Sequence, residues 1–99
     1  MPKLQAEEYH ATYIATLLHK YEGLDHLRTR RRGDVVTIES GPEKEPHAHA
    51  RLRRDTVHFW RLQMATHTGR WEPTPVRASL EEAVATLVES FGWTLTPIV

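Results

Sequence analysis

Apolar residues recur at intervals of three and four positions near both ends of the chain, and each pattern predicts an amphipathic helix. The first stripe, over about residues 2–22, consists of Tyr9, Tyr13, Ile14, Leu17, Leu18 and Tyr21. The second, over 80–91, consists of Leu80, Ala83, Val84, Leu87, Val88 and Phe91. Ser79 and Glu82 have the S-x-x-E spacing of a capping box and mark the start of the second helix. Because each helix is apolar on one side only, both need a surface to pack against.

The central residues, 24–78, lack this helical period and show short β-like runs separated by turn residues. We expect four strands, at about 26–31, 34–40, 47–53 and 56–66. The strands are joined by a turn at 32–33, a loop at 41–46 and a two-residue turn at 54–55. The segment 71–75 contains two prolines, cannot be helical, and is interpreted as part of a crossover over 67–78. Residues 93–99 form an apolar tail.

The order of elements is therefore α-β-β-β-β-α. This order predicts an α+β two-layer sandwich, with a four-stranded antiparallel meander and both helices on one face of the sheet. The chain has 99 residues, which fits a single domain over 1–99 with one modest core. This length favours a module that binds over one that catalyses. The sequence contains no nucleophile elbow, phosphate-cradling glycine loop or dinucleotide fingerprint, so we expect neither an enzyme nor a cofactor.

The run 56–66 carries large apolar groups on both of its faces. With a two-residue turn at 54–55, Leu52 lies opposite Val57, and Trp60, Leu62 and Met64 share the other face. A slip of one residue through a bulge would reverse which side is core. A bulged central strand or a covering tail would explain the second apolar face, and so would a partner. The last alternative makes Trp60, Leu62 and Met64 a candidate interaction surface for another protein or a second copy of the chain.

The charges of the chain sum to zero, with 13 basic and 13 acidic residues, but they are unevenly placed. In a meander the turns at 32–33 and 54–55 lie at the same end of the sheet. Seven arginines surround these turns: Arg28, Arg30, Arg31, Arg32, Arg51, Arg53 and Arg54. Only Asp34 and Asp55 oppose them there. Because a guanidinium binds phosphate oxygens through two hydrogen bonds and stacks on bases, the cluster indicates binding of nucleic acid or another polyanion. Solvated hairpin tips and an acidic protein partner remain as alternatives.

Histidines suggest a second kind of site. His47 and His49 project from the same face of a strand, and His58 lies diagonally opposite His49 in the register with a two-residue turn. Three imidazoles could hold zinc with an open fourth position. No carboxylate completes the set, and exposed or hydrogen-bonded strand histidines are the simpler explanation. We therefore assign no metal and keep these three residues as candidates.

The remaining composition bears on location. The chain has no cysteine and no apolar run of the ~18–20 residues that a membrane span needs, and its first residues do not show the basic-then-apolar pattern expected of a signal peptide. We therefore expect a cytoplasmic protein without membrane contact. Arginine outnumbers lysine, which a high-GC genome would produce, and the absence of asparagine hints at a thermophilic source. The leading hypothesis is a small binding or accessory module that engages nucleic acid or another polyanion. A protein-interaction or dimerisation module and a zinc site are the alternatives.

Overall fold

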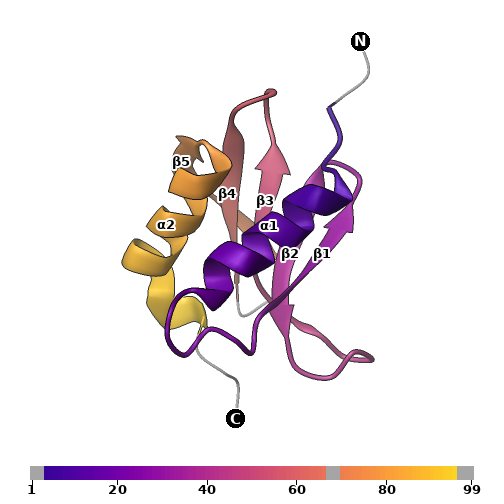
Figure 1. The fold of residues 1–99 in the computed structure, drawn as a ribbon, viewed down its shortest axis with the longest axis vertical. Helices are drawn as coiled ribbons and strands as arrows, with labels where there is room; N and C mark the ends of the chain where they lie inside the picture. The colour runs from indigo at the N-terminus through magenta and orange to yellow at the C-terminus, as the bar shows by residue number, and fades with distance from the viewer. Residues whose placement is uncertain (1–3, 67–69, 96–99) are drawn as a thin grey trace.

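The computed structural model describes residues 4–66 and 70–95 and shows an α+β fold of two layers (Figure 1). The elements are α1 (Glu8–His19), β1 (Arg28–Arg32), β2 (Val35–Ser40), β3 (His47–Arg54), β4 (Trp60–Ala65), β5 (Trp71–Ala78), α2 (Leu80–Phe91) and the short 3-10 helix η1 (Gly92–Leu95). Among these residues the strands form one antiparallel sheet in the order β1-β2-β3-β4-β5. Both helices lie on the same face of this sheet (Figure 1). The expected α+β class is therefore confirmed, but the sheet has five strands and not four.

The fifth strand occupies the segment that the sequence analysis interpreted as a crossover. Residues 71–78 pair with β4 at the edge of the sheet. An edge strand tolerates Pro73 and Pro75, since a missing N–H there costs no ladder hydrogen bond. Near its middle, β5 places three residues opposite Leu62 alone. The Thr74 hydroxyl donates to the Leu62 carbonyl across 2.9 Å, so a side chain satisfies an acceptor that the irregular ladder leaves open.

The connection between β3 and β4 is a five-residue loop over 55–59, not the expected two-residue turn. The backbone N–H of Asp55 donates to the Phe59 carbonyl across 2.9 Å and closes this loop. As a consequence, Leu52 lies opposite Leu62 and not opposite Val57. Val57 and Phe59, which would have made the strand apolar on both faces, belong to the loop.

One core fills the space between the sheet and the two helices. Its largest fully buried side chains are Ile14, Leu18, Leu27, Val36, Ile38, Leu52, Leu62, Val84, Leu87 and Leu95. Trp60 is 2% exposed, Leu62 is fully buried, and Met64 packs against the core. The expected interaction surface on Trp60, Leu62 and Met64 is therefore not open to a partner, because the longer loop turns these residues toward the helices.

The first helix begins later than expected, at Glu8 rather than near residue 2. Its N-cap is Glu7, whose backbone N–H donates to Nδ1 of His10 across 2.9 Å. Glu7 itself has an extended backbone, and the Ala6 N–H donates to the Gly33 carbonyl across 2.9 Å. This hydrogen bond ties the N-terminal segment to the turn between β1 and β2.

The second helix occupies the expected range, Leu80–Phe91. The Ser79 hydroxyl accepts the Glu82 N–H across 3.3 Å, which confirms Ser79 as the N-cap. Among the described residues, the second bond of a capping box, from the Ser79 N–H to the Glu82 side chain, is not found. The expected tail continues as η1, in which Leu95 is buried, while residues 96–99 lie outside the described residues. In the parts of the chain that the structure describes, every helix is too short or too polar to cross a membrane.

Candidate nucleic-acid interface

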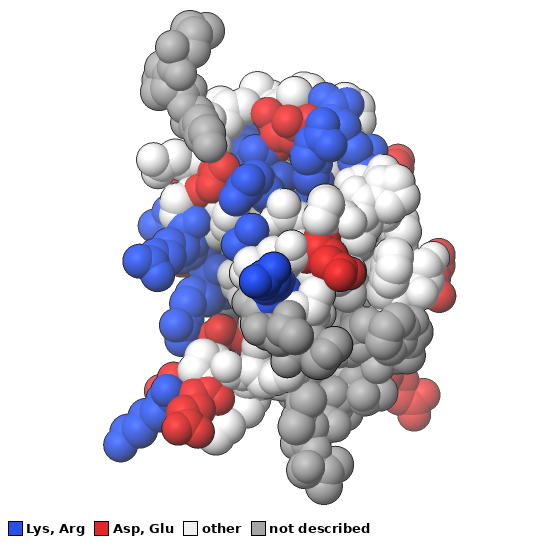
Figure 2. All heavy atoms as spheres, turned by 180° about the vertical axis from the view of Figure 1, so that it is seen from behind, with Lys and Arg blue, Asp and Glu red and all other residues white. Residues whose placement is uncertain are grey.

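The face of the sheet that carries no helix is rich in arginine. Along each strand alternate side chains point to opposite faces, so the residues between the core positions point away from the helices. Their arginines are Arg28, Arg30, Arg32, Arg51, Arg53, Arg61 and Arg77. Figure 2 shows the molecule from this side, where Lys and Arg atoms gather in the upper and left part of the view. We call this set of seven residues the arginine face.

Strand register arranges part of the arginine face as a row. Arg32 pairs with Val35, Val35 with Arg53, Arg53 with Arg61, and Arg61 with Arg77. Four of the five positions across the sheet are thus arginines. With neighbouring strands about 4.8 Å apart, the row spans about 19 Å. Like charges directly opposite one another are destabilising, so this arrangement needs compensation.

Outside the row, the charges of the arginine face are compensated by Glu39, which is only 4% exposed. Its Oε1 lies 3.4 Å from Nε of Arg28 and 3.2 Å from a terminal nitrogen of Arg30. One carboxylate therefore holds two arginines of the β1 edge. Among the described residues, the third arginine of this edge, Arg32, has no acidic partner.

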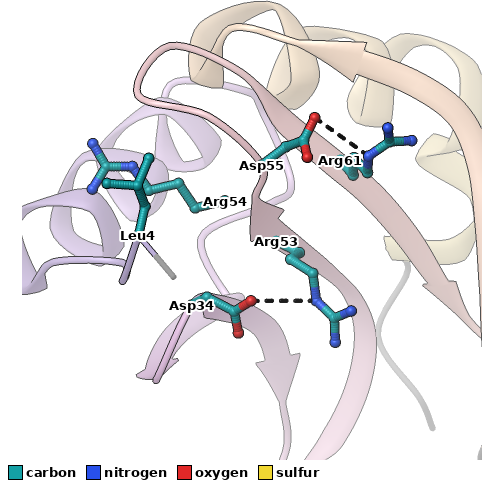
Figure 3. Close-up of a pocket in the computed structure, with 6 residues that line it drawn as sticks. All are labelled: Leu4, Asp34, Arg53, Arg54, Asp55 and Arg61. Carbon is teal, nitrogen blue, oxygen red and sulfur yellow. Dashed lines mark ion pairs between the residues drawn. The ribbon is translucent and has the colours of Figure 1, made fainter. Parts of the chain in front are cut away.

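Two aspartates in the neighbouring loops hold the arginines of the row (Figure 3). Asp34 Oδ2 lies 3.7 Å from Nε of Arg53, and Asp55 Oδ2 lies 3.5 Å from Nε of Arg61. Asp55 also accepts a hydrogen bond from Nε of Arg77, and this bond is the main reason that the pKa of Asp55 lies below its ordinary value. Seven arginines against three carboxylates leave an excess of four positive charges on the face.

Arg51 lies near the middle of the face. The pKa of its guanidinium is lowered from the ordinary value, first by burial and second by the positive charge of Arg53. Its Nε donates to Oε1 of Gln63, and its guanidinium lies over the ring of Trp71, 4.4 Å from the ring centroid. Arginine stays protonated despite such a shift.

A pocket of about 310 Å³ lies beside the middle of the row, where the loops before β2 and after β3 meet. Its lining residues are Leu4, Asp34, Arg53, Arg54, Asp55 and Arg61 (Figure 3). Nε of Arg53 and Nε of Arg54 are buried and, among the described residues, make no hydrogen bond. Three arginines and two aspartates thus line this hollow.

Five of the seven arginines selected from the sequence belong to the arginine face. The other two, Arg31 and Arg54, hold the N-terminal segment. Arg31 binds Glu8 through Nε across 2.8 Å, and a terminal nitrogen of Arg54 donates to the Gln5 carbonyl across 2.8 Å. The cluster is therefore a face of the sheet and not only its end.

Two further arginines of the face, Arg61 and Arg77, were missed by the sequence analysis. The alternation of Trp60, Arg61 and Leu62 contains the signal for Arg61, since an arginine between two core residues of a strand must point away from the core. Arg77 lies in the strand that was interpreted as a crossover, so no alternation was sought there.

The candidate zinc ligands do not come together. The rings of His47 and His49 are 4.9 Å apart, whereas His58 lies in the loop beyond the far end of β3. The ring near His49 that the sequence did not indicate is His26, 6.4 Å away. His49 is buried, and its Nε2 lies 2.7 Å from the Ser40 hydroxyl. Within residues 4–66 and 70–95 no group of three or more histidine or acidic side chains is arranged to hold a metal ion.

Comparison with protein-family models, with curated proteins and with solved structures gives no match to this chain. The fold and the site define the class of protein as a small α+β domain with a cationic sheet face, on which no helix of the described residues lies.

Proposed function

We propose that this chain is a small binding module that holds the phosphate backbone of nucleic acid on its arginine face. The observation that carries this proposal is the row of Arg32, Arg53, Arg61 and Arg77 across the uncovered side of the sheet. Rows of guanidinium groups give affinity that does not depend on base sequence, because they bind the repeating phosphates.

The way these side chains are held supports the proposal. The aspartates contact the Nε atoms of Arg53, Arg61 and Arg77. Among the described residues, the terminal nitrogens of these three guanidinium groups make no hydrogen bond, and the only bond found is from Nε of Arg77 to Asp55. The carboxylates thus position the arginines, while the terminal nitrogens remain available to oxyanions. Fixing side chains before a ligand arrives lowers the entropy cost of binding.

The charge of the face sets the expected strength of the salt dependence. Its excess of four positive charges corresponds to release of about four counterions, and for a single strand the logarithm of the affinity then falls with a slope of about −3 against the logarithm of salt concentration. Between 50 and 200 mM salt the affinity should fall about 50-fold.

The test compares two double variants with the wild type at 100 mM salt, using fluorescence anisotropy of a labelled oligonucleotide. Arg32→Gln with Arg61→Gln removes two charges from the face and should weaken binding about 25-fold. Lys20→Gln with Lys44→Gln removes the same charge from exposed positions outside the face and should leave the affinity nearly unchanged.

Thermal unfolding followed by circular dichroism checks that all three proteins are folded. The proposal fails if the wild type shows no binding at low salt. It also fails if the lysine variant loses as much affinity as the arginine variant.

A further inference from the structure

Two arginines of the face lie over aromatic rings. The guanidinium of Arg51 is 4.4 Å from the ring centroid of Trp71, and that of Arg77 is 4.7 Å from the ring centroid of Phe59. Both guanidinium groups have a second contact that fixes them, because Arg51 donates to Gln63 and Arg77 donates to Asp55. The face therefore carries two guanidinium planes that each lie against an aromatic ring, in addition to its charges.

Phe59 adds an exposed apolar surface to this arrangement. It lies in the loop over 55–59 and is 41% exposed, next to Val57 at 56%. A ring that only filled the core would be covered, as Trp60 is at 2%. The exposed ring beside Arg77 thus has no role in the core that would explain its position.

We propose that the Arg51–Trp71 and Arg77–Phe59 pairs are stacking sites for unpaired bases, so that the ligand of the face is single-stranded nucleic acid. This inference rests on the proposed function and names its ligand class. Arginine planes and aromatic rings are the groups on which proteins stack unpaired bases. The phosphates on either side of a stacked base would contact the row.

The distance between the two stacking sites is too large for neighbouring bases of a duplex to occupy both sites at once. Arg51 and Arg77 lie two strands apart across the sheet and two residues apart along the strands, which together is about 12 Å. Neighbouring bases within a duplex strand rise only about 3.4 Å and point toward the partner strand. A base can reach either pair only when it is turned out of its stack.

The first test uses the wild type with two single strands of twelve nucleotides, one of thymidines and one of abasic sites. The strands carry the same phosphates and differ only in the presence of bases. The thymidine strand should bind at least about fivefold more tightly than the abasic strand, which is the effect of one base stack at the lower end of its range. Equal affinities would overturn the inference.

The second test locates the stack. Phe59→Leu keeps an apolar side chain but removes the ring, so the affinity for the thymidine strand should fall about fivefold while that for the abasic strand stays the same. The matched control is Tyr9→Leu, which removes a ring that is 64% exposed on α1, and it should change neither affinity. An unchanged ratio in the Phe59 variant would refute stacking at this residue.

The outcomes separate the two proposals. If both strands bind with equal, salt-sensitive affinity, the phosphate-binding face stands and base stacking is refuted. If neither strand binds at low salt, both proposals fail.

Discussion

Glu39 should have opposite effects on the stability of the fold and on the binding of nucleic acid. It is the most buried carboxylate of the arginine face, with a side chain 6% exposed, compared with 22% for Asp34 and 28% for Asp55. Its Oε1 lies within 3.4 Å of nitrogens of both Arg28 and Arg30. The substitution Glu39→Gln keeps the size of the side chain and removes its charge.

The loss of stability is set by the exposure of the two partners. The side chains of Arg28 and Arg30 are 34% and 55% exposed, so solvent screens both ion pairs. Exposed pairs contribute up to about 1 kcal/mol each, and we expect Glu39→Gln to lower the free energy of unfolding by about 1 kcal/mol. In a domain of this size this corresponds to a fall in Tm of about 4–8 °C.

The gain in affinity follows from the charge. Removing one carboxylate raises the excess on the face from four to five, and the affinity for a single strand at 100 mM salt should rise about fivefold. Thermal unfolding by circular dichroism and fluorescence anisotropy measure the two effects on the same sample.

The control is Glu43→Gln, which removes the same charge at an exposed position in the loop 41–46. It should leave Tm unchanged and alter binding little. An unchanged Tm for Glu39→Gln, or weaker binding by this variant, would refute the role given to Glu39.

Three further substitutions test the fold. Burial, and next the charge of Arg54, lower the pKa of His10, whose Nδ1 must be unprotonated to accept the N–H at the start of α1. The unfolded chain then binds a proton at higher pH than the folded one, so the free energy of unfolding should fall as the pH drops from about 6.5. In urea unfolding between pH 5 and 8, His10→Gln should reduce the dependence of this free energy on pH. Equal slopes would contradict this. Ser79→Ala removes the cap of α2 and should lower the free energy of unfolding by about 1 kcal/mol, whereas an unchanged Tm would exclude the cap as a source of stability. Thr74→Val leaves the Leu62 carbonyl unpaired and should cost about 1 kcal/mol in the same measurement; no loss would mean that water replaces the hydroxyl.

The helices could be predicted from the sequence because their signals are local. The apolar period and the pair Ser79 and Glu82 define α2 completely, and its bounds are those expected. Gly23 has a left-handed φ of 82° but lies four residues after the end of α1 at His19, whereas Gly92 is the C-cap of α2, has φ of −56° and leads into η1. A glycine therefore permits a helix stop without requiring one.

The sheet was predicted less well because its register depends on loop length. Asp55 and Thr56 look like the end of a tight turn followed by a strand, but both N–H groups bond to the Phe59 carbonyl and form a longer loop. This change reverses which face of the next strand is core. The last strand, β5, was not predicted because its two prolines argue against a strand unless it lies at a sheet edge, and the sequence does not show that it does.

The sequence predicted only part of the candidate site, because the site also depends on the register of the strands. Clustering along the chain revealed the arginines of β1 and β3, because they adjoin turns that a meander must bring together. Only the true register separates Arg53, on the open face, from Arg54, which binds the N-terminal segment. The same register adds Arg61 and Arg77 to the face.

The salt dependence of single-strand binding tests the central claim most directly. For the wild type, the slope of log affinity against log salt concentration should be about −3, and for Arg32→Gln with Arg61→Gln about −1.4. The Lys20→Gln with Lys44→Gln control should keep the wild-type slope. A slope near zero for the wild type, or an arginine variant whose slope equals that of the wild type, would contradict the assignment of nucleic-acid binding to the arginine face.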